Sequence, residues 1–230
     1  MKYMGSKARL ASKILPIVLA DRDGLYVEPF VGGANTFHLV DGPKWGNDAN
    51  ADVVAMLQSV GNGWVPPSDI SEDEYAKLRY DNADPKLRGF VGIGCSYSGK
   101  FFGGYARGND SRGIPRNYAR ESRDNVLRQA KGLSGARWTA LPYWEMDIPR
   151  GSTVYCDPPY ANTTGYKSEF DSDKFWDWAT VLSQTCNVFV SEFVAPRGWR
   201  CVWAKDRYTS LTKDTGSKSA VERLFVYGPS

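Results

Sequence analysis

An acid followed by two prolines constrains this chain more than any other feature of its sequence. Residues Thr153 to Cys156 are β-branched, aromatic or small, which predicts a short buried strand of a parallel sheet. The strand must end at Asp157, because Pro158 and Pro159 lack ladder donors and disfavour helix at the residue before each ring. A carboxylate on a rigid turn is therefore expected at the carboxyl end of a strand, where open α/β sheets bind their ligands.

The tetrapeptide Asp157-Pro158-Pro159-Tyr160 carries groups suited to one reaction. The exocyclic amine of a nucleobase is a poor nucleophile, because its lone pair is delocalised into the ring. The Asp157 carboxylate and the Pro158 carbonyl can each accept one of its N–H bonds, which frees the lone pair to attack an activated methyl group. Tyr160 offers a face on which the base can stack. These four residues are predicted to be catalytic; the alternative is a strand-ending acid followed by a polyproline turn.

The composition fits a soluble globular protein. The 230 residues suffice for one large domain, or for one domain with an insertion, and 42% are hydrophobic and 24% charged. The four cysteines are widely spaced, so we expect reduced, buried thiols and neither disulfides nor zinc. With His38 as the only histidine, a histidine-based triad or metal site is excluded, and no metal is predicted. No signal-like or membrane-spanning apolar run is found, so we expect a cytoplasmic protein.

A glycine turn in the first fifth of the chain predicts a nucleotide-like ligand. The apolar run Leu25 to Phe30 reads as a strand, and Val31 to Asn35 as a turn before a helix, the order used in nucleotide-binding folds. A second short strand, Pro43 to Asp48, ends in an acid that is placed to hold two ribose hydroxyls. Capping of the following helix, Ala49 to Val60, is the alternative role for Asp48.

The basic charge of the chain is concentrated between Lys86 and Arg137. This segment holds eleven basic and three acidic residues, a net charge of +8 against +3 for the whole chain, as expected where a polyphosphate docks. The loop from Cys95 to Arg107 mixes aromatic and basic residues with glycines, and could stack on an extruded base. A helix from Ile114 to Lys131, started by Pro115, places arginines on one face. A solvated basic helix is the alternative. The predicted DNA-binding residues are Lys100, Tyr105, Arg107, Arg112, Arg116, Arg120 and Arg123.

The remaining segments predict further helices and strands. Lys7 to Leu19 has apolar residues at helical spacing, interrupted by Pro16. Ser71 and Glu74 form a capping box that starts a short helix. The polar stretch from Ala161 to Phe170 is expected to form a flap over the active site. Towards the C-terminus we expect a helix capped by Asp171 or Ser172, a buried strand from Asn187 to Phe193, and strands at Trp199–Trp203 and Glu222–Tyr227 with a polar loop from Thr212 to Ser219 between them.

Three motifs in a fixed order identify a resemblance. They are Tyr3-x-Gly5-x-Lys7, then Val27 to Ala34 (Val-Glu-Pro-Phe-Val-Gly-Gly-Ala), then Asp157 to Tyr160. The sequence resembles the DNA adenine methyltransferases of the Dam-like (D12) class, in particular compact phage-type members. The resemblance is close from Tyr3 to about Asn50 and from Thr153 to the C-terminus, and loose in between.

The resemblance implies an α/β fold of the Rossmann-like methyltransferase type, with a mostly parallel seven-stranded sheet whose last strand is reversed. Residues 1–60 and 138–230 would form the catalytic domain, and 61–137 an inserted segment that recognises the target. The implied cofactor is S-adenosylmethionine, and the implied partner is double-stranded DNA. We expect the protein to act as a monomer or weak dimer. The implied cofactor-binding residues are Tyr3, Lys7, Glu28, Phe30, Gly32, Asp48 and Asp157.

Within that set, Glu28 would face the methionine end of the cofactor, Asp48 would hold the ribose, and Phe30 and Gly32 would form the turn. Two departures from the family pattern concern details. Ala34 replaces the third glycine of the turn, and the recognition segment does not match the family's usual loops, so GATC specificity is not inherited.

Other functions remain open from the sequence. A related enzyme could methylate cytosine in DNA, adenine in RNA or a protein glutamine, although Asp157 favours adenine because cytosine enzymes more often carry serine and glutamine enzymes asparagine there. A catalytically silent protein that binds or masks DNA is a second alternative. A nicotinamide-dependent oxidoreductase would explain Asp48 but leaves the tetrapeptide without a role.

Overall fold

The protein is an α/β structure built on one sheet. The computed structural model describes residues 1, 3–159, 170–208 and 219–228. Its strands are β1 (Tyr26–Glu28), β2 (Lys44–Asn47), β3 (Arg137–Thr139), β4 (Thr153–Cys156), β5 (Asn187–Glu192), β6 (Trp199–Tyr208) and β7 (Ser219–Tyr227). Its α-helices are α1 (Ala11–Val18), α2 (Ala51–Gly61), α3 (Glu72–Leu78), α4 (Pro85–Gly94), α5 (Tyr118–Leu133) and α6 (Ser172–Leu182), with 3-10 turns η1 (Phe37–Leu39), η2 (Tyr97–Gly99) and η3 (Tyr143–Glu145).

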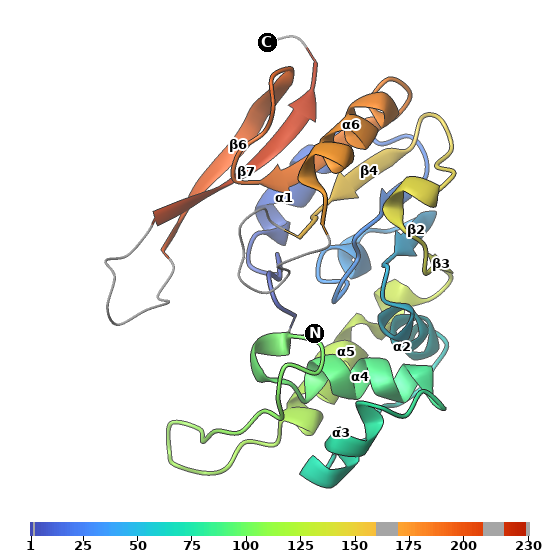
Figure 1. Ribbon diagram of the computed structural model, residues 1–230. Coiled ribbons are helices and arrows are strands. Elements are labelled where there is room, and N and C mark those ends of the chain that lie inside the picture. Colours follow the sequence, from blue (N-terminus) through green and yellow to red (C-terminus); the bar gives the residue numbers. More distant parts are fainter. Residues whose placement is uncertain (2, 160–169, 209–218, 229–230) are drawn as a thin grey trace. The chain divides into compact units, whose positions relative to one another are not determined.

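The seven strands are ordered β3-β2-β1-β4-β5-β7-β6 (Figure 1). Strand β4 runs parallel to β1 and to β5, and β2 runs parallel to β3. Strand β7 is antiparallel to both β5 and β6. A mostly parallel sheet with a reversed last strand confirms the predicted Rossmann-like fold class. Among the described helices, none combines the length and apolar character needed to cross a bilayer.

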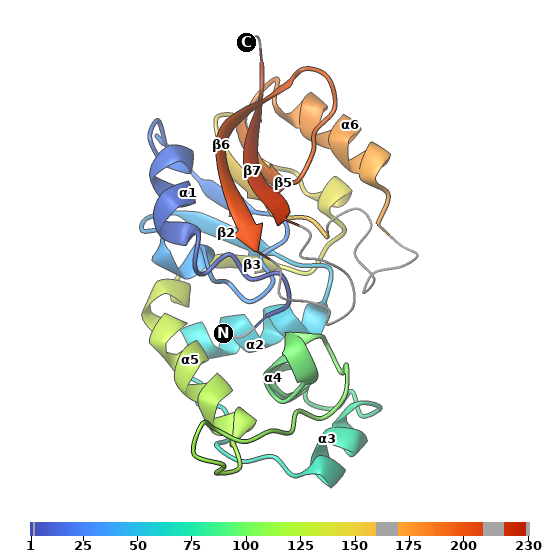
Figure 2. The ribbon, with the colours of Figure 1, turned by 90° about the vertical axis from the view of Figure 1, so that its left-hand side faces the viewer.

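The chain divides into two compact units. The first comprises residues 1–11 and 31–143, and the second residues 12–30 and 144–230. In the second unit, α1 and α6 cover opposite faces of the strands (Figure 2). The core of this unit includes the fully buried side chains of Tyr26, Tyr155 and Leu224. Helix α6 begins at its expected cap, because Asp171 accepts a hydrogen bond from the Lys174 N–H.

In the first unit, α4 packs closely on α2 and α5 through its glycines. A Cβ at Gly89 would lie 2.0 Å from the Asp52 carbonyl oxygen, and one at Gly94 would lie 2.8 Å from the Ser122 Cβ. The absence of side chains at these positions lets the helix backbones approach. Helix α3 starts with the predicted capping box, in which Ser71 and Glu74 satisfy each other's backbone N–H groups.

Several predicted boundaries differ from the structure for local reasons. The first helix begins at Ala11 rather than Lys7. The helix expected after the glycine turn is only the 3-10 turn η1, since Gly42, with φ +78°, and Pro43 redirect the chain into β2. Helix α5 starts after its cap Asn117 rather than at Pro115, because Pro115 forms an antiparallel bridge with Asn109.

The C-terminal strands are longer than predicted, so Ser219 belongs to β7. The rest of the loop predicted from Thr212, and residues 161–169 of the predicted flap, lie outside the described residues. All four cysteines are free, and three are buried as expected. The prediction of a buried thiol is wrong for Cys201, which is exposed because β6 is the outermost strand of the sheet.

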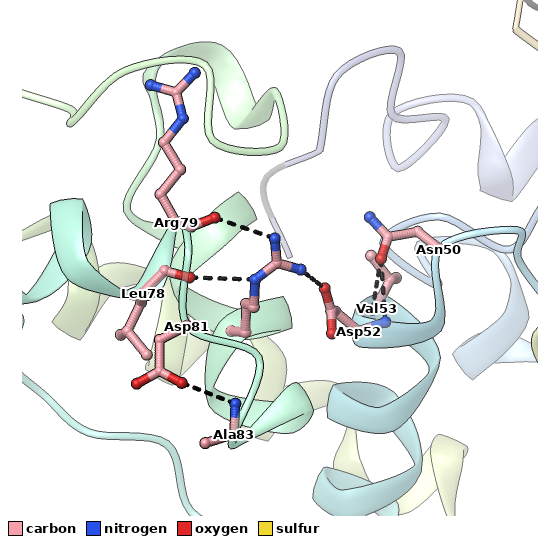
Figure 3. A network of polar contacts seen from close by, with 8 residues as sticks. Asn50, Asp52, Val53, Leu78, Arg79, Asp81 and Ala83 are labelled. Carbon is pink, nitrogen blue, oxygen red and sulfur yellow. Dashed lines mark hydrogen bonds and ion pairs between the residues drawn. The ribbon is translucent and has the colours of Figure 1, made fainter.

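Arg88, one of the cations of the basic segment, has a structural role. Its guanidinium forms an ion pair with Asp52 of α2, and it donates hydrogen bonds to the carbonyls of Leu78 and Arg79 at the end of α3, both at 3.2 Å (Figure 3). Less than a fifth of either ionic side chain is exposed (19% and 14%). This residue therefore joins three helices of the first unit.

Replacing Arg88 by methionine is expected to lower the free energy of unfolding by about 2–4 kcal/mol. The change leaves the Asp52 carboxylate without its cationic partner and two carbonyls without their donors. Urea denaturation followed by circular dichroism measures the loss. The matched control is Arg79→Met, whose exposed side chain should contribute about 0.5 kcal/mol or less. Equal effects of the two substitutions would contradict this role.

Candidate active site and nucleic-acid interface

The glycine turn Val31–Asn35 is hydrogen-bonded to the end of β2. The Val31 N–H donates to the Asn47 carbonyl at 2.8 Å, and the Gly32 N–H donates to Asp48 Oδ2 at 2.9 Å. Gly32 has φ +49°, a left-handed conformation that favours glycine. Ala34, at φ +53°, adopts the same conformation although it carries a Cβ. The turn predicted from the sequence is present, and its geometry is fixed by Asp48.

Asp48 anchors the turn and does not cap the next helix. Its second oxygen, Oδ1, accepts the Asn50 N–H at 2.9 Å. The cap of α2 is Asn50, whose side chain accepts from the N–H groups of Asp52 and Val53 (Figure 3), so the alternative role of Asp48 is wrong. Burial raises the pKa of Asp48, and the two N–H bonds oppose that rise. Each oxygen holds one backbone N–H and retains acceptor capacity for a hydroxyl.

The N-terminal segment covers the turn through Tyr3. A Cβ at Gly32 would lie 2.8 Å from Tyr3 Cε1, and one at Gly33 would lie 2.8 Å from Tyr3 Cβ. Lys7 is buried, with 3% exposure, and its Nζ donates to the Gly5 carbonyl at 3.3 Å. The structure therefore brings Tyr3, Gly32 and Asp48 together, as their predicted role in binding one ligand requires.

In the second unit, two carboxylates lie at the ends of neighbouring parallel strands. Glu28 ends β1, is buried, and accepts a hydrogen bond from the Tyr26 hydroxyl at 2.7 Å. Asp157 directly follows β4 and is half-buried. Because β1 and β4 are parallel, their carboxyl ends lie at the same edge of the sheet.

Two buried residues of β4 have raised pKa values in the presence of these acids. Burial, followed by the charges of Glu28 and Asp157, raises the pKa of the Cys156 thiol well above its ordinary value. The pKa of Tyr155 is also raised, by burial first and by Asp157 second. Both carboxylates therefore lie near the Cys156 thiol at the carboxyl end of β4.

The remaining predicted site residues near β1 and β4 are two prolines and two aromatic residues. Pro158 is buried and Pro159 half-buried, whereas Tyr160 lies outside the described residues. The Phe30 ring packs edge-on against Phe175 of α6, with centroids 5.7 Å apart. Phe30 thus has a packing role inside the second unit.

Sequence reasoning missed the polar side chains that order the strand ends. Tyr155 and Ser191 share a hydrogen bond of 2.8 Å between β4 and β5. Asn47 is fully buried, accepts from the Thr139 hydroxyl at 2.8 Å, and donates to the Leu141 carbonyl at 2.9 Å. A polar residue within an apolar strand is the signal that could have identified both.

The predicted DNA-binding residues fall into two groups. Three arginines form ion pairs at the surface: Arg107 with Glu72, Arg112 with Asp110, and Arg116 with Glu121. Exposed pairs of this kind are worth about 0–1 kcal/mol, so a phosphate can replace the carboxylate. Lys100 and Arg120 are exposed and Arg123 is half-buried. A hollow of about 300 Å³ at the start of α5 is lined by Asp110, Ile114, Pro115, Arg116, Asn117, Arg120, Glu121 and Asp124.

The aromatic residue exposed in the glycine-rich loop is Tyr97 rather than Tyr105. The Tyr105 hydroxyl donates to the Ile70 carbonyl at 2.7 Å, and its ring packs on Tyr75 with centroids 5.5 Å apart. The Tyr97 side chain is 68% exposed, next to Ser98 at φ +57°. The surface that can stack on a base is therefore presented by η2.

Solved structures similar to this chain are methyltransferases at low identity. The rRNA methyltransferase aviRa from Streptomyces viridochromogenes matches with a TM-score of 0.43 and 10% identity, covering 98% of this chain and 86% of that chain. A candidate RNA methyltransferase from Pyrococcus horikoshii matches with a TM-score of 0.45 and 10% identity, covering 98% and 87%. Similarity at this level carries no functional argument, so the fold assignment rests on the strand order.

The family comparison concerns the N-terminal part of the chain. Residues 3–85 match the model of the D12 class N6 adenine-specific DNA methyltransferases. The matched region contains the Tyr3 segment, the glycine turn and Asp48. The match confirms, over these residues, the resemblance to Dam-like methyltransferases of the D12 class.

Proposed function

We propose that the protein methylates the N6 amine of adenine in DNA, with S-adenosylmethionine as the methyl donor. The observation that carries the proposal is the position of Asp157, half-buried directly after a buried parallel strand and followed by two prolines. The family match over residues 3–85 supports methyl transfer and an adenine target. The matched residues include all of the proposed cofactor-binding residues except Asp157.

The residues of the glycine turn fit the cofactor by the chemistry of their donor set. Asp48 would accept the ribose hydroxyls, Gly32 would let the backbone approach, and Tyr3 and Lys7 would complete this side. By the sequence resemblance, Glu28, Phe30 and Asp157 would also contact the cofactor, with Glu28 facing its methionine end. When bound, S-adenosylmethionine supplies a methyl group activated by its sulfonium.

The target amine would be held by the residues that directly follow β4. Asp157 would accept one N–H of the adenine N6 amine, and the Pro158 carbonyl would accept the other, which directs the nitrogen lone pair towards the methyl carbon. Pro159 fixes the turn, and Tyr160 would stack on the base. Asp157 need not remove a proton beforehand, because the methylated ammonium is acidic and loses its proton afterwards. Positioning supplies much of the rate in such a site.

Residues 61–137 would act as the target-recognition segment inserted between the catalytic parts, 1–60 and 138–230. Their net positive charge would bind duplex DNA mainly through its phosphates. The adenine would be rotated out of the helix, at a cost of about a few kcal/mol of unstacking. The protein would work in the cytoplasm as a monomer or weak dimer.

The proposal is tested by two measurements on the purified protein. Calorimetry should detect S-adenosylmethionine binding, and tritium from the labelled methyl group should transfer to duplex DNA. DNA binding without cofactor binding would instead support a silent protein that masks DNA. Transfer to RNA or to protein in preference to DNA would reject the proposed substrate.

Tyr97→Ala is expected to weaken binding of adenine-containing duplex DNA by about 10-fold, since stacking of one base is worth about 1–3 kcal/mol. Fluorescence anisotropy with a labelled duplex measures the change. The matched control is Tyr80→Ala, a tyrosine that is 80% exposed and lies outside the basic segment between Lys86 and Arg137. A similar loss in both variants would show that the Tyr97 ring has no specific contact.

A further inference from the structure

Gln129 of α5 is a buried side chain that holds the glycine turn. It is 3% exposed, and its Nε2 donates to the Gly33 carbonyl and to Asn35 Oδ1, both at 3.2 Å. The Ala34 carbonyl lies 3.4 Å from the same nitrogen. His38 Nδ1 also lies 3.4 Å from it. An amide nitrogen carries two hydrogens, so they are shared among these neighbours. One side chain thus contacts three successive residues of the turn.

The conformation of the turn needs such support. Ala34 is held at φ +53°, which costs about 1–2 kcal/mol for a residue with a Cβ and persists only where the surroundings impose it. Gln129 Oε1 is buried and has no hydrogen-bond partner among the described residues. An unsatisfied buried acceptor costs about 1–3 kcal/mol, and the bonds that Nε2 makes to the turn offset part of that cost.

The helix that carries Gln129 also carries part of the basic surface. Arg120 is exposed on α5 and lines the hollow at its start. Gln129 lies nine positions after Arg120, which corresponds to about 13 Å along a helix. At the other end α5 is fixed against η1, because a Cβ at Gly132 would lie 1.9 Å from the His38 carbonyl oxygen.

We propose that Gln129 is a positioning residue that couples DNA binding along α5 to the cofactor turn. This inference rests on the proposed function. A polyanion bound at Arg120 restrains α5, and the Gln129 amide transmits that restraint to Gly33 and Asn35 through its hydrogen bonds. Because coupling between two binding sites is reciprocal, the cofactor should change DNA affinity by the same factor.

The test measures the coupling factor, which is the change in affinity for one ligand caused by binding of the other, in both directions. Calorimetry gives the affinity for S-adenosylhomocysteine with and without a saturating mixed-sequence duplex, and anisotropy gives the DNA affinity with and without S-adenosylhomocysteine. In the wild-type protein each affinity should change by about fivefold or more. Gln129→Met keeps the side-chain size but loses the hydrogen-bond donor, so in this variant the coupling factor should fall close to 1. Its DNA affinity without S-adenosylhomocysteine should change by less than about twofold. The control Gln58→Met, at an exposed position of α2, should keep the wild-type factor.

Each outcome bears on the inference. Retention of the wild-type factor in Gln129→Met, or independent binding in the wild type, would overturn it. A wild-type protein that binds no S-adenosylhomocysteine would instead reject the proposed function, and this inference with it. If the methionine variant does not fold, hydrogen exchange in the wild-type chain decides: DNA should slow exchange of the amides of residues 32–35, and unchanged exchange would overturn the inference.

Discussion

Replacing Asp157 by alanine should reduce methyl transfer to DNA by about 1,000-fold or more, comparable to the loss of one preorganised transition-state contact. The alanine cannot accept an N–H from the adenine amine, so the nitrogen lone pair stays delocalised. The residue is half-buried at the end of β4 rather than inside the core, so the fold should survive. Initial rates of label transfer at saturating substrates measure the effect.

Asp177→Ala is the matched control for this substitution. Asp177 is an exposed acid on α6 in the same unit, and its removal should leave the rate within about twofold. Thermal unfolding of both variants should resemble that of the wild type. Near-normal transfer by Asp157→Ala would rule out the proposed mechanism.

Gly32→Ala should weaken S-adenosylmethionine binding by about 10-fold or more. The added Cβ would lie 2.8 Å from Tyr3 Cε1, so Tyr3 or the turn must move. The substitution also places a Cβ on a residue at φ +49°, which costs about 1–2 kcal/mol. Calorimetry measures the affinity, and urea denaturation measures the change in stability.

Gly135→Ala separates these two effects. Gly135 has φ +71°, and a Cβ there would have nothing within 4 Å. This control should show a similar backbone cost and an unchanged affinity for the cofactor. If Gly32→Ala bound the cofactor as tightly as the control does, the turn would not be its binding site.

Local chemistry explains which elements could be predicted from the sequence. Strand β4 was predicted with its exact bounds because two prolines end it, and the caps Ser71 and Asp171 were found because capping depends on neighbouring residues. The start of α5 was not found, because Pro115 is held in a bridge to Asn109 that its own neighbours do not specify.

The candidate site likewise has features that the sequence predicts and features that only the folded chain shows. Asp48 was selected from its position after a short strand, but its bond to the Gly32 N–H depends on strands meeting in space. The charge count between Lys86 and Arg137 omitted Glu72, which precedes that segment and pairs with Arg107. Tyr97 and Tyr105 lie in the same loop, and only the folded chain shows which ring is exposed.

The identity of the methylated nucleoside tests the central claim most directly. Duplex DNA is incubated with the protein and S-adenosylmethionine carrying a deuterated methyl group, digested to nucleosides and analysed by mass spectrometry. The proposed function predicts labelled N6-methyladenine in the wild-type reaction and about 1,000-fold less or none with Asp157→Ala. Labelled cytosine, or unlabelled DNA from a protein shown to bind both substrates, would contradict it.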